Sequence, residues 1–87
     1  MNDISETLNV RGSRYGEYAD VSKVTQDLID VISQSKSFSE LNACQKTSLF
    51  MICNKIARAV SGDPHYRDNW HDIAGYATLA EKECSDE

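Results

Sequence analysis

Apolar residues recur every three or four positions along most of the chain, and this spacing constrains the fold more than any other feature. Such spacing places side chains on one face of an α-helix. It predicts a helix from about Asp20 to Ser35, with apolar positions at Val21, Val24, Leu28, Val31 and Ile32. It also predicts a long helix from near Ser39 to Val60, whose apolar residues form a band wider than one stripe.

The ends of the long helix and of the helix that follows carry their own signals. Ser37, followed three residues later by Glu40, matches a capping box that opens the long helix, and Ser61-Gly62 ends it. The last helix begins at Asp63-Pro64 or at Asp68. Its inward face is expected to hold Trp70, Ile73, Ala74, Ala77 and Leu79 or Ala80.

The start of the chain predicts a short helix over residues 1–10, which Gly12 is placed to stop. Residues 11–18 then contain two glycines, two arginines and two tyrosines, which is typical of a structured loop. Gly75 lies inside the last helix at a cost of about 1 kcal/mol relative to alanine, so we expect close packing there.

The length of 87 residues predicts one helical domain, with an ordered core over about 4–80 and an acidic tail over 81–87. The fold class is all-α, a three- to four-helix unit with an antiparallel helical hairpin. Burying the wide apolar band of the long helix is difficult in so small a monomer. Either that helix is central or a second subunit covers it, and we favour a homo-oligomer.

The charge and composition exclude several classes of protein. The formal net charge of −5 disfavours direct nucleic-acid binding, which needs a concentrated basic surface. No apolar run approaches the roughly 20 residues that cross a bilayer, and the N-terminus lacks the layout of a signal peptide, so we expect a cytoplasmic protein without membrane contact. The three cysteines predict free thiols, with Cys44 and Cys53 packed in the core.

The segment from Arg11 to Tyr18 is the strongest candidate for ligand contact. Arg11 and Arg14 supply planar forks for phosphate or carboxylate, and Tyr15 and Tyr18 can stack on a base. The alternative is a tight turn whose tyrosines anchor it to the core. The segment lacks the spacing of a P-loop, and no nucleophile–base pair is apparent, so we name no catalytic residue.

Basic and acidic rows mark the last two helices. Lys55 and Arg58 share one face of the long helix, and Asp68, Asp72 and Tyr76 form a row on the last one. Across an antiparallel hairpin these rows would meet. Either they form ion pairs that fasten the hairpin, or the two aspartates hold a divalent metal such as magnesium while the cations take a polyphosphate.

Three segments carry a resemblance to known families: LNVRGSRYGEY over 8–18, KIAR over 55–58 and DNWHDIAGYATL over 68–79. Together they resemble a family of small bacteriophage and prophage proteins of unassigned activity, and a domain found near phage nucleotide-modification genes. A more distant likeness is to the all-α nucleoside triphosphate pyrophosphohydrolases, which hold magnesium with E-x-x-E and E-x-x-D motifs. This chain departs from them, because its helical carboxylates are aspartates and the E-x-x-E pairs are missing.

The resemblance implies a phage-encoded protein in the host cytosol. Our main hypothesis is that it binds a nucleotide or a nucleotide-derived signal and sequesters it from a host defence. The predicted ligand-binding residues are Arg11, Arg14, Tyr15, Tyr18, Lys55, Arg58 and Tyr76, and the predicted metal ligands are Asp68 and Asp72. The alternatives are an interaction module that inhibits a host enzyme and a magnesium-dependent pyrophosphohydrolase-like enzyme.

Overall fold

The computed structural model describes residues 4–84, and they form an all-α structure, as predicted. The helices are α1 (Ile4–Tyr15), α2 (Tyr18–Ser33), α3 (Ala43–Ser61) and α4 (Arg67–Glu81), with a 3-10 turn, η1 (Phe38–Glu40), before α3. Residues 1–3 and 85–87 of the predicted domain lie outside the described residues.

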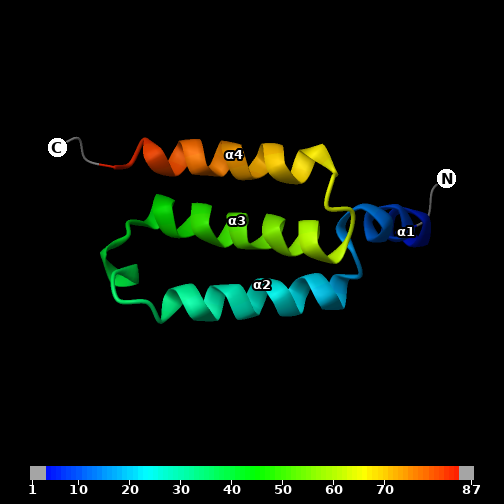
Figure 1. Cartoon of the computed structure of the whole chain (residues 1–87), viewed down its shortest axis with the longest axis horizontal. Coiled ribbons are helices and arrows are strands. Elements are labelled where there is room, and N and C mark those ends of the chain that lie inside the picture. The colour runs from blue at the N-terminus through cyan, green and yellow to red at the C-terminus, as the bar shows by residue number, and fades with distance from the viewer. Residues whose placement is uncertain (1–3, 85–87) are drawn as a thin grey trace.

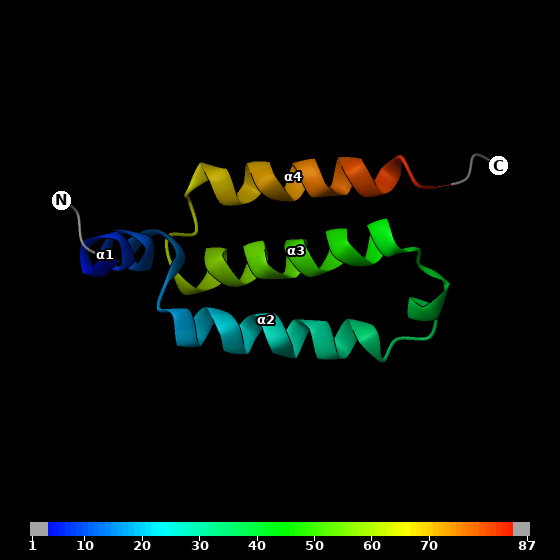
Figure 2. The ribbon, with the colours of Figure 1, turned by 180° about the vertical axis from the view of Figure 1, so that it is seen from behind.

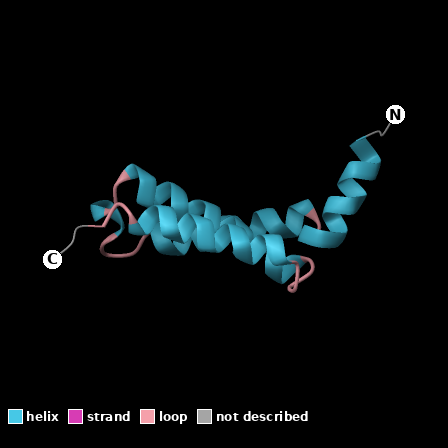
Figure 3. Ribbon diagram, turned by 90° about the horizontal axis from the view of Figure 1, so that it is seen from above, coloured by secondary structure: helices cyan, strands magenta, loops and turns pink. Residues whose placement is uncertain are grey.

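Three of the helices lie side by side in one layer, with α3 between α2 and α4 (Figure 1). The same order is seen from behind in Figure 2. Within the described residues α3 contacts both neighbours, whereas α2 and α4 do not contact each other. The long helix is therefore central, and its coverage by a second subunit stays a prediction. Helix α1 extends from one end of the layer (Figure 3).

Small side chains on opposite sides of α3 let its neighbours approach closely. Ala57 is fully buried, and Ala59 and Ser48 are nearly so. On the α2 side, Asn54 Nδ2 donates to Thr25 Oγ1 over 3.4 Å. On the α4 side, Lys55 Nζ lies 3.0 Å from an Asp72 carboxylate oxygen, so the predicted ion pairing across the α3–α4 hairpin is seen at this position.

Two predicted helix boundaries are wrong near the start of the chain. Helix α1 continues through Gly12 and ends at Tyr15, so Arg11, Arg14 and Tyr15 are helical rather than part of a loop. The break comes instead at Gly16, whose φ of 89° lies in the left-handed region that favours glycine. Helix α2 then begins at Tyr18, two residues before the predicted start.

The capping box of α3 also lies elsewhere than predicted. Asn42 accepts from the Gln45 backbone N–H, and the Gln45 side chain accepts from the Asn42 backbone N–H, so these residues form the box. Ser37 and Glu40 instead flank and end the 3-10 turn. The end of α3 at Ser61-Gly62 is as predicted.

The inward face of α4 is rotated from the predicted one. The residue most deeply buried is Asn69, which is 1% exposed, whereas Trp70 is 54% exposed. Because α4 packs against α3 alone, only one narrow side of it is covered, and Trp70 projects about 100° away from Asn69. Cys44 is likewise exposed rather than in the core, whereas Cys53 is buried as predicted.

A close crossing of two backbones joins α1 to the end of α3. A Cβ on Gly16 would lie 2.4 Å from the carbonyl oxygen of Ser61, and one on Gly62 would lie 2.4 Å from Gly16 N. The Asp63 N–H donates to the Arg14 carbonyl over 3.0 Å at the same point. Gly75, in contrast, has nothing within 4 Å of an added Cβ in the part of the chain that the structure describes, so the close packing expected there is not seen.

Between Ile4 and Cys84, no helix combines the length and the apolar character needed to cross a membrane.

Candidate functional site

A cleft of about 360 Å³ opens where α1, α2 and α3 meet. Four of the predicted ligand-binding residues, Arg11, Tyr15, Tyr18 and Arg58, line it. The remaining lining residues are Leu8, Gly12, Gly16, Glu17, Val21 and Asn54. The cleft exists because α1 continues as a helix past Gly12 and is then held against α3 by the glycine crossing.

Two guanidinium groups lie over one tyrosine in this cleft. Arg11 Cζ lies 4.9 Å from the centroid of the Tyr15 ring, and Arg58 Cζ lies 4.6 Å from it. Arg11 and Tyr15 are one turn apart on α1, but Arg58 comes from the last turn of α3. At these distances the ring face attracts both cations, which offsets part of their mutual repulsion.

A second arginine–tyrosine contact continues from the first. The rings of Tyr15 and Tyr66 meet edge to face, with centroids 5.6 Å apart. Arg14 Cζ lies 5.3 Å from the Tyr66 centroid, and Arg14 Nη1 donates to the Tyr66 hydroxyl over 3.3 Å. Arg14 is therefore engaged beside the cleft and is not among the residues that line it.

The Tyr66 hydroxyl is the junction between this cluster and α4. It donates to an Asp68 carboxylate oxygen over 3.1 Å. This hydrogen bond raises the pKa of Tyr66 above its ordinary value, desolvation adds to the rise, and the charge of Arg14 lowers it. Tyr66 thus stays protonated as a donor to Asp68 across the neutral range.

The charges of the cluster do not cancel. Arg11, Arg14 and Arg58 bring three positive charges, whereas Glu17 in the cleft and Asp68 beside it bring two negative ones. The two arginines of the cleft face only the Glu17 carboxylate among its lining residues. An acidic chain therefore presents a locally cationic cleft.

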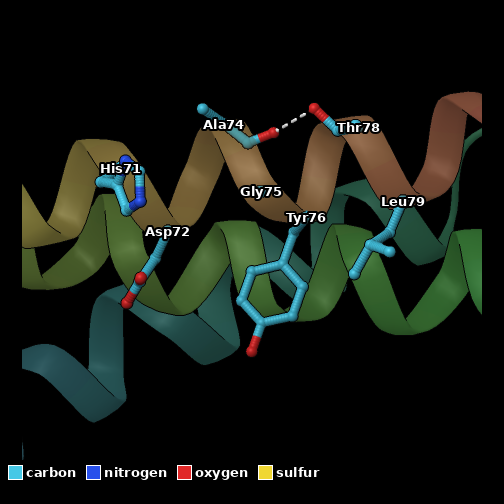
Figure 4. A pocket seen from close by; sticks show the side chains of 7 residues that line it. All are labelled: His71, Asp72, Ala74, Gly75, Tyr76, Thr78 and Leu79. Atoms are coloured by element: carbon cyan, nitrogen blue, oxygen red, sulfur yellow. Dashed lines mark hydrogen bonds between the residues drawn. The ribbon is translucent and has the colours of Figure 1, made fainter.

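The structure separates the other predicted site residues from this cleft. Lys55 is 8% exposed and turned toward Asp72. Tyr76 lines an open hollow of about 660 Å³ farther along α4, next to Gly75 and Leu79. In Figure 4 the side chains of Asp72, Tyr76 and Leu79 project to the same side of α4.

The prediction that Asp68 and Asp72 hold magnesium stays a prediction. Each carboxylate has another partner, because Asp68 accepts from Tyr66 and Asp72 pairs with Lys55. Among residues 4–84 no three His, Cys, Asp or Glu side chains gather closely enough to hold a metal ion.

Sequence reasoning missed two members of the site, Tyr66 and Asn54. Tyr66 follows Pro64 and His65 in the connection before α4, and nothing in that segment signals that it packs on α1. Asn54 lies one turn before Arg58 on α3, and this spacing places both side chains on one face of the helix. The four-residue spacing from Arg58 could therefore have identified Asn54 from the sequence.

A comparison with protein families finds one model, DUF6378, a domain of unknown function, which matches residues 1–84. No curated protein and no solved structure matches the chain.

Proposed function

We propose that this chain, which belongs to the DUF6378 family, binds a nucleotide or a nucleotide-derived signal in the cleft between α1, α2 and α3. Arg11 and Arg58 take the phosphates, and Tyr18 stacks against the base. In this proposal binding alone is the activity, and a phage-encoded copy would sequester a host signal.

The observation that carries the proposal is the convergence of Arg11 and Arg58 on one cleft in a chain of net charge −5. Two guanidinium groups from different helices repel each other, and an aromatic face or an anion that contacts both of them offsets part of that repulsion. Tyr15 provides the aromatic face, and a phosphate would provide the anion. Arginine forks match phosphate oxygens in bidentate hydrogen bonds.

The cleft also has the size and the aromatic surface that a nucleotide needs. Its volume of about 360 Å³ falls within the range of about 300–1,000 Å³ that is usual for small-ligand sites. Tyr18 lies at the edge of the cleft, and 85% of this residue is exposed. Stacking of a base on an aromatic ring contributes about 1–3 kcal/mol. Tyr18 is better placed for this stacking than Tyr15, because the Tyr15 ring already contacts two guanidinium groups.

Thermal unfolding against a panel of mononucleotides, cyclic dinucleotides and pyrophosphate tests the proposal. A ligand at 100 times its Kd stabilises the folded state by about 2.7 kcal/mol. For a domain of this size that corresponds to a rise in Tm of about 10–20 °C. Arg58→Gln should abolish the rise. The matched control is Arg67→Gln, which removes an arginine at the same end of the layer that does not line the cleft.

Equal shifts in wild type and Arg58→Gln would place the ligand elsewhere. No shift across a saturating panel would reject the proposal and favour the alternative of a protein-interaction module. If a nucleotide does bind, product analysis with magnesium present separates binding from hydrolysis. The pyrophosphohydrolase alternative requires turnover that Asp68→Asn together with Asp72→Asn abolishes.

A further inference from the structure

The layer of α2, α3 and α4 is one helix thick, and this leaves the chain with too little core. Among the described residues, the apolar side chains that are buried are Val21, Cys53, Ala57 and Ala59. The accessible surface is 6497 Å², whereas a compact monomer of 9.8 kDa exposes about 5,200 Å². The radius of gyration is 14.9 Å, against about 12 Å for a compact domain of 87 residues.

The two faces of the layer differ in character, and α3 shows this most directly. Thr47, Asn54 and Arg58 share one stripe of α3, and Asn54 and Arg58 line the cleft. Each of these residues is followed two positions later by an apolar one, about 200° around the helix. These apolar residues, Leu49, Ile56 and Val60, form a second stripe with the same spacing. This second stripe faces away from the cleft.

The neighbouring helices extend both faces. On α4, Tyr76 and Leu79 line a hollow together with Thr47, so they lie on the cleft side, and Trp70 lies about 180° from Leu79. On α2, Tyr18 lines the cleft, and Val31 lies about 140° from it. The face opposite the cleft thus holds the following residues, which we call the apolar face: Val31, Leu49, Ile56, Val60, Trp70 and Ala77.

The geometry points to a second copy of this chain as the occupant of the apolar face. The chain exposes about 1,300 Å² more than a compact monomer of its mass, part of it on α1, which has no buried residue. A standard interface buries about 800 Å² on each partner, so the uncovered surface is large enough for one such contact. The central stripe runs along the middle helix of the layer, where a two-fold axis brings the same patch of both copies together. Exposed Val60 and Trp70 supply the apolar and aromatic side chains that such contacts use.

This pairing leaves the cleft open, because Arg58 and Tyr18 lie on the other face of the layer. Assembly and ligand binding are then separate properties of the chain. The inference therefore does not depend on the proposed function, and its failure is seen without any ligand.

Sedimentation equilibrium combined with tryptophan fluorescence tests the pairing. The chain has one tryptophan, Trp70, which is half exposed in a single copy. Wild type should sediment as a dimer at micromolar concentration, and its emission maximum should move to longer wavelength as dilution dissociates it. Val60→Glu should sediment as a monomer with red-shifted emission at all concentrations. Leu79→Glu, an exposed apolar residue on the cleft side of α4, is the matched control and should remain dimeric.

A wild-type monomer at millimolar concentration overturns the inference. So does a dimer that Leu79→Glu dissociates while Val60→Glu leaves it intact, because that result places the interface on the cleft face. If Val60→Glu fails to fold, the dilution series on wild type decides alone, since a Trp70 emission that is constant while the dimer dissociates rules out burial of the apolar face.

Discussion

The crossing of Gly16 and Gly62 holds α1 against the layer, and replacing Gly62 with alanine tests how much of the structure depends on it. The new Cβ would lie 2.4 Å from both Gly16 N and the carbonyl carbon of Tyr15, and 2.7 Å from the Arg14 carbonyl oxygen. All three are backbone atoms, so no side chain can rotate away. Carbon contacts are optimal at about 3.5–4.0 Å, so the two backbone segments must separate by about 1 Å or more.

That separation also breaks the hydrogen bond from the Asp63 N–H to the Arg14 carbonyl. Overpacking costs about 1–3 kcal/mol, and a lost backbone hydrogen bond adds about 1 kcal/mol. We therefore expect Gly62→Ala to lower the free energy of unfolding by about 3 kcal/mol. A domain of this length has about 4–13 kcal/mol in total, so the loss is a large fraction of it.

Gly75→Ala is the matched control, because the same methyl group meets nothing within 4 Å inside α4. Alanine is better than glycine in a helix interior by about 1 kcal/mol, so this variant should be more stable than wild type. Thermal unfolding followed by circular dichroism measures both changes. We expect Tm to fall by about 12–24 °C for Gly62→Ala and to rise by about 4–8 °C for Gly75→Ala.

Hydrogen exchange then locates the damage. In Gly62→Ala the amides of α1 should lose protection before those of α3, because α1 is attached through this crossing. A Tm within 2 °C of wild type would refute the reasoning, because it would mean that the two backbones do not meet as closely as the structure has them. A destabilised Gly75→Ala would equally show that the open surface of α4 is covered by something else.

Three further predictions concern side chains. Asp72→Asn should cost about 1–2 kcal/mol in urea unfolding, because it leaves the nearly buried Lys55 ammonium without its carboxylate. Asp27→Asn, at the exposed Lys23–Asp27 pair, should cost clearly less, and equal costs would contradict the assignment. Burial raises the pKa of the Cys53 thiol, so a thiol reagent at pH 8 should modify Cys44 and Cys84 quickly and Cys53 only on unfolding. Fast reaction of all three thiols would show that Cys53 is not buried. The raised pKa of Tyr66 favours its protonated form in the folded state, so its contribution is present below an unfolded pKa of about 10 and is lost as pH rises through the folded pKa. Stability should consequently fall more steeply above pH 10 in wild type than in Tyr66→Phe.

The helices themselves follow from local patterns in the sequence. The three- and four-residue spacing of apolar side chains predicted α2, α3 and α4, and Gly62 marked the end of α3. The errors lie where several residues carry competing signals. Gly12 and Gly16 are both possible stops for α1, and only the close approach of Ser61 selects Gly16. Likewise Ser37 and Asn42 are both possible N-caps, and the 3-10 turn between them displaces the start of α3.

The orientation of α4 could not be read from its apolar residues. Sequence reasoning turned Trp70 inward together with Ile73 and Ala77, which recur at helical spacing. In the structure Asn69 takes the inward position, and its side-chain nitrogen has no hydrogen-bond partner among residues 4–84. An unpaired buried amide costs about 1–3 kcal/mol, so this orientation must be compensated by the packing around it.

Only part of the candidate site could be predicted from local patterns in the sequence. Arg11 and Tyr15 are one turn apart, and a helical reading of that segment would have placed them together. Arg58 and Tyr66 join them only through the crossing of α1 with the end of α3, which is a tertiary contact between residues about 50 positions apart. No local pattern encodes such a contact, so the sequence identified Arg11, Tyr15, Tyr18 and Arg58 as ligand candidates without predicting the crossing that joins them.

The central helix explains why the two proposals are independent. A helix packed on opposite sides by α2 and α4 keeps two uncovered stripes, and residues two positions apart fall on different ones. Arg58 and Val60 are such a pair: one guanidinium lines a cationic cleft and one isopropyl group faces away from it. Two neighbouring positions can therefore vary under separate constraints, ligand charge for the first and apolar contact for the second. A double variant, Arg58→Gln with Val60→Glu, should accordingly lose ligand stabilisation and dimerisation without any coupling between the two losses.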